Sequence, residues 1–266
     1  MEFPTADGPG TLQEAPRAGD AEIDALRPWF HNLHLPDGRQ TSPDHRLGDF
    51  PRFKWEAMAA HVPEDLRGWT AIDVGCNAGF YSIELAKRGA QVTAVDVDEH
   101  YLRQASWAVE RFGLQDRVTV RAGNAYELAR ERERYDLVWL TGVLYHLRHP
   151  LAAIDAAAGA ARRLVVAQSL TRVDREERAP DDLAYSERGR LSEPGWPAMS
   201  LIPGKFAGDP TNWWAPNRAC LRAMLESAGL RCVASPDAET FVCEPTGETP
   251  HAGELAALAG GREGSR

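Results

Sequence analysis

The stretch DVGCNAGFYS, residues 73–82, lies between an apolar run and a run with helical spacing. TAIDVG at its start predicts a short buried strand, and FYSIELAKRG after it predicts a helix that Gly89 ends. A glycine-containing turn between a strand and a helix is where open α/β sheets bind nucleotides. The stretch therefore predicts either a cofactor-binding loop or only a tight turn of an α/β protein.

The same alternation continues along the chain. The expected strands are QVTAVDV, RVTVRAG, YDLVWLTG and LVVAQSL, and the expected helices include one that Asp98 caps and Gly113 ends and the alanine-rich LAAIDAAAGAARR. A further helix is expected to open at Pro216, followed by LRCVAS and ETFVCE as an antiparallel pair. This order predicts an α/β fold with a Rossmann-like, doubly wound sheet of seven strands, the last pair antiparallel.

Composition narrows the class of protein. The 266 residues carry a net charge of −9, which disfavours a nucleic-acid partner, although a local basic face could still exist. The four cysteines form no CxxC pair, which indicates reduced thiols and a cytoplasmic location. The N-terminus has no signal-peptide pattern, and no apolar run is long enough to span a bilayer, so no membrane partner is expected.

The loop departs from the dinucleotide pattern G-x-G-x-x-G. It has Gly75, Asn77 and Gly79, and Phe80 stands where the third glycine would be. Asp73, two residues before the first glycine, would repel a pyrophosphate and attract an ammonium group. These two positions disfavour a nicotinamide dehydrogenase.

DVGCNAG resembles the first motif of class I S-adenosylmethionine-dependent methyltransferases, with Asn in place of the middle glycine. Further along, Asp96 stands where that family places the acid that binds the ribose hydroxyls, and Asn124 where it places a polar residue on the adenine amine. The resemblance implies S-adenosylmethionine as cofactor. The cofactor-binding residues that it implies are Asp73, Gly75, Cys76, Asn77, Gly79, Asp96, Val97, Asn124, Ala125 and Thr141.

A narrower resemblance involves WFHNLHLPDG, FKWEAM, GVLYHLRHPL and NWWAPNRACLRAMLESAGL. These segments are similar to the DUF1698-type group, which includes tRNA wobble-uridine carboxymethyltransferases. That group uses carboxy-S-adenosylmethionine and holds its extra carboxylate with basic residues upstream of the first motif. After Trp29 this chain instead has Phe30 and His31 and no lysine, which favours the ordinary cofactor.

Tyr145 and His146 follow the fourth strand, at the edge where such sheets bind ligands, and are the catalytic candidates. His146 could take a proton from the acceptor, or it could only fix its loop through hydrogen bonds. The residues expected to line the substrate pocket are Trp29, His31, His34, Trp213 and Trp214. The last two tryptophans could instead pack beneath an insertion. No metal site is expected, since the two His-x-x-His pairs lie outside predicted helices.

The expected organisation has four consecutive parts, one of which contains an insertion. Residues 1–20 are a disordered N-terminus, 21–68 an N-terminal cap segment, 69–245 the methyltransferase domain, and 246–266 a flexible tail. Within the domain, 171–215 form an insertion on the acceptor side, after the fifth strand.

The leading functional hypothesis is in-line methyl transfer to O or N of a small-molecule or sugar-like acceptor. A tRNA-modifying carboxymethyl- or methyltransferase using carboxy-S-adenosylmethionine is the alternative, and a non-catalytic cofactor-binding protein is the second. The oligomeric state stays open between monomer and homodimer.

Overall fold

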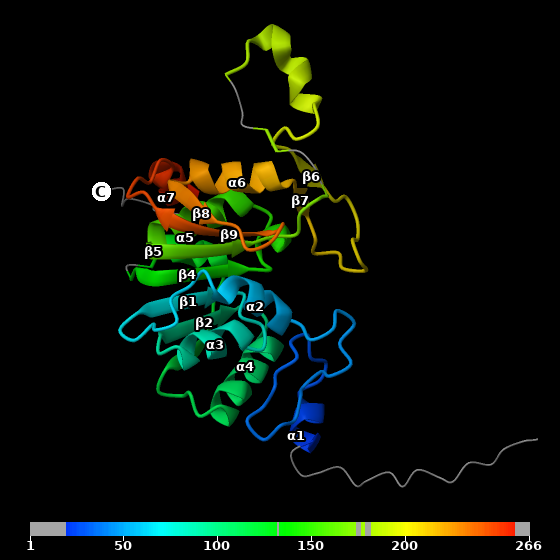
Figure 1. Cartoon of the computed structure of the whole chain (residues 1–266), viewed down its shortest axis with the longest axis vertical. Coiled ribbons are helices and arrows are strands. Elements are labelled where there is room, and N and C mark those ends of the chain that lie inside the picture. The colour runs from blue at the N-terminus through cyan, green and yellow to red at the C-terminus, as the bar shows by residue number, and fades with distance from the viewer. Residues whose placement is uncertain (1–19, 132, 174–176, 179–181, 259–266) are drawn as a thin grey trace, which may run out of the picture.

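The computed structural model describes residues 20–131, 133–173, 177–178 and 182–258. Its centre is a seven-stranded sheet of order β3-β2-β1-β4-β5-β9-β8 (Figure 1). The strands are β1 (Thr70–Val74), β2 (Gln91–Asp96), β3 (Val118–Ala122), β4 (Tyr135–Thr141), β5 (Ala161–Gln168), β8 (Leu230–Ala234) and β9 (Thr240–Pro245). β9 runs antiparallel to both β5 and β8, whereas the other pairs are parallel. The expected Rossmann-like α/β fold, with its closing antiparallel pair, is confirmed.

Helices cover both faces of the sheet, which explains why its central strands are apolar throughout. Side chains alternate between the faces, so that Ala71 joins one apolar cluster and Ile72 the other. The first cluster holds α2 (Arg52–Ala59), α3 (Phe80–Lys87) and α4 (Glu99–Arg111). The second holds α5 (Pro150–Ala160), α6 (Arg218–Ser227) and the 3₁₀ helix η1 (Ala125–Ala129).

The helix ends follow from local capping chemistry. The Asp98 side chain accepts a hydrogen bond from the His100 N–H and begins α4, as expected. Gly89, with φ at 102°, follows the end of α3 in the left-handed conformation that a C′ residue needs.

The last long helix begins later than its sequence suggests. Its N-cap is Asn217, whose side chain accepts from the Cys220 N–H, and α6 starts at Arg218. Pro216, expected to open this helix, ends the short strand β7 (Trp214–Pro216), which pairs with β6 (Met199–Leu201). An amide side chain can satisfy the free N–H groups of a helix start and a proline ring cannot, so this expectation was wrong by two residues.

The alanine-rich helix is shorter than expected. It ends at Ala160, and β5 begins directly at Ala161, so that two arginines assigned to the helix lie in the strand. Pairing of Ala161 with Tyr135 on β4 competes with the helical propensity of the alanines. Arg163 forms an ion pair with Asp136, which fixes this register further.

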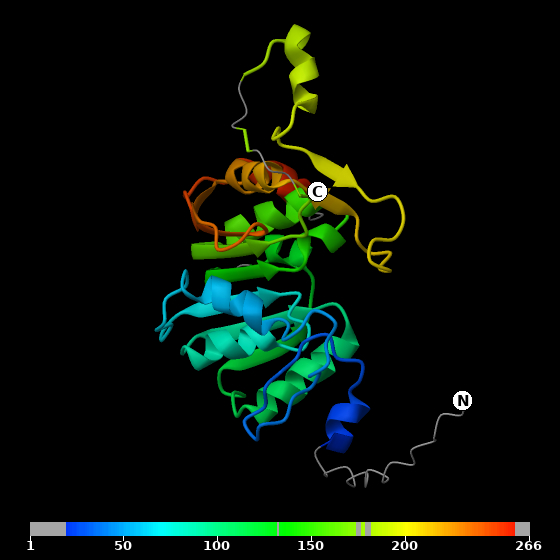
Figure 2. The same cartoon turned by 45° about the vertical axis from the view of Figure 1, so that its right-hand side comes forward.

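Two segments flank the sheet on the side that the parallel strands point to (Figures 1 and 2). One is the N-terminal segment that includes α1 (Asp20–Ala25), and the other is the part of the insertion after β5 that forms β6 and β7. The 3₁₀ helix η3 (Tyr185–Ser192) of the same insertion projects beyond α6, at the top of both views. Residues 1–19 and 259–266 lie outside the described residues. Inside the stretch expected to be a flexible tail, Ala252–Leu258 form α7. Across the part of the chain that the structure describes, no helix has the length and apolar character to cross a membrane.

Candidate functional site

The loop after β1 has the conformation that its sequence requires. Gly75, Asn77 and Gly79 all have positive φ values, of 73°, 51° and 81°. The N–H groups of Gly75 and Cys76 both donate to the carbonyl of Val95 on β2, which holds the loop against that strand. A Cβ at Gly75 would overlap Val143, and one at Gly79 would lie 3.3 Å from Ala105. The loop therefore leaves no room for a side chain at Gly75 and little at Gly79, and Cys76 within it is fully buried.

Asp96 ends β2 and shapes this loop. Its Oδ2 accepts from the Asn77 N–H at 2.9 Å, and its Oδ1 accepts from the Asp98 N–H at 3.0 Å. Only 8% of the residue is exposed, and this burial raises the pKa of its carboxyl group. The Val97 backbone also contacts this carboxylate, which keeps lone-pair capacity for a further donor such as a ribose hydroxyl. Val97, the next residue, is largely exposed beside it.

Asp73 lies beneath the loop, with 1% of the residue exposed. Its Oδ2 accepts from the Ser82 hydroxyl of α3 at 2.6 Å. This contact engages one side of the carboxyl group. Burial, with a further contribution from the charge of Asp96, raises the pKa of Asp73 to about 7. A cation bound above the loop would favour its ionised form.

Two polar candidates on neighbouring strands already have intramolecular partners. Asn124 caps η1, accepting from the Tyr126 N–H and donating to Glu127. The Thr141 hydroxyl, at the end of β4, accepts from the Trp139 indole at 2.9 Å. Tyr81 of α3 also reaches Thr141. Ala125, beside Asn124, is buried.

Tyr145 and His146 lie in η2 (Leu144–His146), shortly after β4. Hydrogen bonds join this short helix and the residue after it to the insertion. The Trp213 N–H donates to the Tyr145 carbonyl at 2.8 Å, and the Trp214 indole donates to the Leu147 carbonyl at 3.1 Å. His146 Nδ1 lies 2.8 Å from the Thr211 hydroxyl oxygen. The structure thus brings Trp213 and Trp214 of the insertion next to Tyr145 and His146, which lie far from them along the chain.

An acidic edge, formed by Asp209, Asp237 and Glu239, adjoins these residues. Burial, followed by the charges of Glu239 and Asp209, raises the pKa of Tyr145 to about 12. Glu239 accepts from Lys54 of α2 at 2.7 Å and from Gln168 of β5 at 3.1 Å. None of these five residues was expected at the site from the sequence. Gln168 alone carried a signal, as a polar side chain at the end of an apolar strand.

The three candidates from the N-terminal segment have different partners. The Trp29 indole donates to the Ile23 carbonyl, and its ring packs 5.6 Å from that of Trp107. His31 is 5% exposed, with its ring 6.4 Å from Phe80 at the start of α3.

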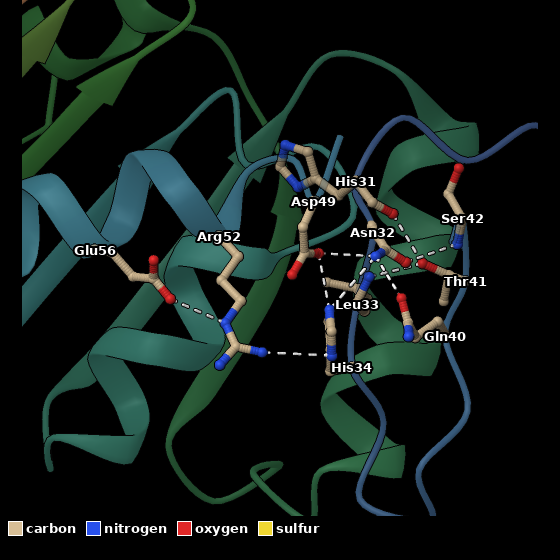
Figure 3. Close-up of polar contacts among 10 residues, drawn as sticks. All are labelled: His31, Asn32, Leu33, His34, Gln40, Thr41, Ser42, Asp49, Arg52 and Glu56. Carbon is tan, nitrogen blue, oxygen red and sulfur yellow. Dashed lines mark hydrogen bonds and ion pairs between the residues drawn. The ribbon is translucent and has the colours of Figure 1, made fainter. Parts of the chain in front are cut away.

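In Figure 3 no dashed line reaches the His31 ring, and its Nδ1 finds no hydrogen-bond partner among the described residues. Burial lowers the pKa of His31 to about 3, with the nearby His45 adding to the effect, so the ring is neutral.

His34 has different partners. Its Nε2 lies 2.8 Å from Asp49, and Arg52 approaches its other ring nitrogen (Figure 3). It lines a cavity of about 340 Å³ together with Glu84 and Lys87, on the outer side of α3. Phe80, at the start of α3, also lines this cavity, and the His31 ring lies 6.1 Å from that of Tyr81, the next residue. Among the described residues, no three or more His, Cys, Asp or Glu side chains gather as metal ligands would.

The chain is similar to known methyltransferases over the region that contains this site. The family described as "Methyltransferase domain" matches residues 71–167. A tRNA U34 carboxymethyltransferase from Marinobacter nauticus is 34% identical over 248 residues, which cover 83% of this chain and 68% of the relative. One from Pseudoalteromonas translucida is 26% identical over 190 residues, covering 70% of this chain and 51% of the relative. The chain spans about half to two thirds of the length of such relatives.

Solved structures share the fold. The N-terminal domain of EvdMO1, solved with S-adenosylhomocysteine bound, has a TM-score of 0.56 at 20% identity, covering 89% of this chain and 98% of that one. Monomeric WbdD has a TM-score of 0.50 at 15% identity, covering 85% of this chain and 48% of that one.

Proposed function

Because this chain belongs to the class I S-adenosylmethionine-dependent methyltransferases, together with its tRNA U34 carboxymethyltransferase relatives, we propose that it transfers a methyl group to O or N of a small-molecule or sugar-like acceptor. A cytoplasmic location is part of the proposal, since the four cysteines are free thiols.

The observation that carries the proposal is the loop of Gly75, Asn77 and Gly79 tied to Asp96. Gly75 and Gly79 carry no side chains, and a Cβ at either position would meet Val143 or Ala105. Asp96 offers carboxylate lone pairs to a ribose. The buried Asp73 supplies negative potential for a cationic ligand. A pyrophosphate would be disfavoured by the same charge, so the residues present fit an adenosine that carries a sulfonium and an ammonium group.

Bound S-adenosylmethionine would supply an electrophilic methyl group on a positively charged sulfur. The task left to the protein is to hold the acceptor in line behind that methyl and to exclude water. The aromatic side chains of Tyr81, Tyr145 and Trp213 are suited to this, because they come from α3, η2 and the insertion, which converge at the end of β4. His146 is the candidate for removing a proton from the acceptor.

The electrostatics of the acidic edge favour the ordinary cofactor over its carboxylated form. An extra carboxylate near Tyr145 would meet the negative charges of Asp209 and Glu239. Lys54, a cation at this edge, is already held by Glu239. His31, whose ring packs against Phe80 at the start of α3, is neutral.

A tRNA acceptor is the second candidate, because the relatives with up to 34% identity are named as tRNA U34 carboxymethyltransferases. The net charge of −9 and the acidic edge argue for a small molecule instead.

Calorimetric titration with S-adenosylmethionine, S-adenosylhomocysteine, carboxy-S-adenosylmethionine and NAD tests the proposal. We expect micromolar binding of the first two, and loss of that binding in Asp96→Ala. A clear preference for the carboxylated cofactor would support the tRNA candidate, and binding of NAD alone would overturn the proposal.

A further inference from the structure

A hydrogen-bonded chain links His146 to the insertion. His146 Nδ1 lies 2.8 Å from Thr211 Oγ1 and 3.3 Å from the Thr211 carbonyl oxygen. Thr211 in turn donates its hydroxyl to Asp209 Oδ1 at 2.6 Å and its backbone N–H to the same oxygen at 2.7 Å. Asp209 Oδ2 is 4.0 Å from His146 Nδ1.

The segment that carries Asp209 and Thr211 is fixed by its own hydrogen bonds. Phe206 and Asp209 exchange two backbone hydrogen bonds, of 3.0 and 3.1 Å. The Asn212 side chain donates to the Phe206 carbonyl, and the Ile202 N–H donates to the Trp213 carbonyl. These contacts set the position of the Thr211 hydroxyl before any ligand binds.

The direction of the hydrogen bonds determines where the ring proton of His146 lies. A hydroxyl has one hydrogen, and that of Thr211 is given to Asp209. Hydrogen bonds from Thr211 and the charge of His146 lower the pKa of Asp209 although burial opposes them, so its carboxylate only accepts. Thr211 Oγ1 can then offer His146 only a lone pair, and the Thr211 carbonyl likewise only accepts. Both neighbours of Nδ1 are acceptors, so Nδ1 carries the hydrogen and Nε2 keeps its lone pair.

We propose that Asp209, acting through the Thr211 hydroxyl, is a positioning residue that holds His146 in the Nδ1–H form and so makes Nε2 the base for the acceptor. The role of Nε2 rests on the function proposed above, whereas the tautomer rests on the geometry alone. In the step, the acceptor oxygen or nitrogen forms a bond to the methyl carbon, and the carbon–sulfur bond breaks with its electron pair left on sulfur. The acceptor proton passes to Nε2, and the resulting imidazolium later releases it to water.

The charges around the ring suit this role. Burial lowers the pKa of His146, against the opposing effect of Asp209 and the Thr211 backbone, so the ring is neutral and able to accept at neutral pH. The imidazolium that forms would lie beside the Asp209 carboxylate, which stabilises it. The Tyr145 ring, with its centroid 4.2 Å away, is the neighbouring titratable group on the same element, and its raised pKa keeps it uncharged.

Long-range ¹H–¹⁵N correlation spectra of the histidine-labelled full chain, without ligand, test the tautomer. Such spectra distinguish Nδ1–H from Nε2–H rings, and His146→Gln identifies the signal. We expect the Nδ1–H pattern in the wild type and in Thr211→Ser, which keeps the hydroxyl. Thr211→Val, of nearly equal shape, should lose that pattern in part or whole. An Nε2–H pattern in the wild type, or an unchanged tautomer in Thr211→Val, would overturn the proposal.

Asp209→Asn separates charge from hydrogen bonding. An asparagine oxygen can still accept from Thr211, so the tautomer should stay, while the pKa of His146 should fall by about one unit as the carboxylate charge is lost. An unchanged pKa in the same NMR titration would contradict the role of Asp209. None of these measurements needs the acceptor or the cofactor, so their failure differs from failure of the cofactor-binding test.

Discussion

The backbone N–H of Asn77 donates a 2.9 Å hydrogen bond to Asp96 Oδ2 and so joins the loop after β1 to the end of β2. The carboxylate that would hold a ribose therefore also shapes the loop on which the rest of the cofactor would lie. Since hydrogen bonds to charged groups contribute about 1.5–3 kcal/mol, Asp96→Asn should raise the Kd for S-adenosylhomocysteine by roughly 10- to 100-fold.

Asp98→Asn is the matched control for this change. It lies two residues further on and caps α4, and asparagine is an equally good cap. The Kd measured by calorimetry should therefore stay within about two-fold of the wild-type value. Equal losses in both variants would mean that Asp96 has no special part in binding.

The buried Asp73 should make stability depend on pH. Its carboxyl has an ordinary pKa of 3.8 in the unfolded chain and about 7 in the folded one, because of burial. Between these values the folded state holds the extra proton, so the free energy of unfolding falls as pH rises. Above about pH 7, the pKa in the folded chain, the free energy of unfolding has lost at most about 4 kcal/mol. Below pH 3.8, the pKa in the unfolded chain, nothing is lost.

Asp73→Asn keeps an acceptor for Ser82 and removes this titration. In urea denaturation, the variant should gain stability relative to the wild type on going from pH 5 to pH 8, and it should bind S-adenosylmethionine more weakly. Asp116→Asn, at an exposed site before β3, controls for the change in net charge and should show no such gain. A difference between Asp73→Asn and the wild type that is the same at both pH values would contradict the raised pKa.

Gly75 and Gly113 allow backbone strain to be separated from steric overlap. Both have positive φ values, of 73° and 65°, so alanine at either position costs about 1–2 kcal/mol. A Cβ at Gly113 meets open space, whereas one at Gly75 overlaps Val143 next to η2. We expect Gly113→Ala to keep full cofactor affinity, and Gly75→Ala to lose binding and at least about 3 kcal/mol of unfolding free energy. Similar losses of affinity and stability in both variants would show that backbone strain, and not the overlap with Val143, causes the effect.

Cys232 should be the most reactive of the four thiols. A hydrogen bond with Cys243 lowers the pKa of Cys232, while burial raises the pKa of both Cys76 and Cys220. Iodoacetamide at neutral pH, followed by peptide mass spectrometry, should modify Cys232 first. Cys243→Ala should slow that reaction, because alanine has no donor for the Cys232 thiolate. Earlier modification of Cys220 would contradict the prediction.

The sequence by itself determined the order of the seven sheet strands and of the four long helices between them, the cap at Asp98 and the antiparallel closing pair. These features depend on side-chain periodicity and on contacts between residues a few positions apart, which the order of residues records directly.

Only the tertiary structure decided where the alanine-rich helix ends and which hydrogen-bond partners Asp73 and His146 have. Ala161 begins a strand because it meets Tyr135, and His146 meets a hydroxyl 65 residues away. The same holds for His31 and His34, which lie three residues apart but have different partners: the His31 ring packs against Tyr81, and His34 lies 2.8 Å from Asp49. Such outcomes depend on how segments distant along the chain pack together, and the free energy of those contacts outweighs local propensity.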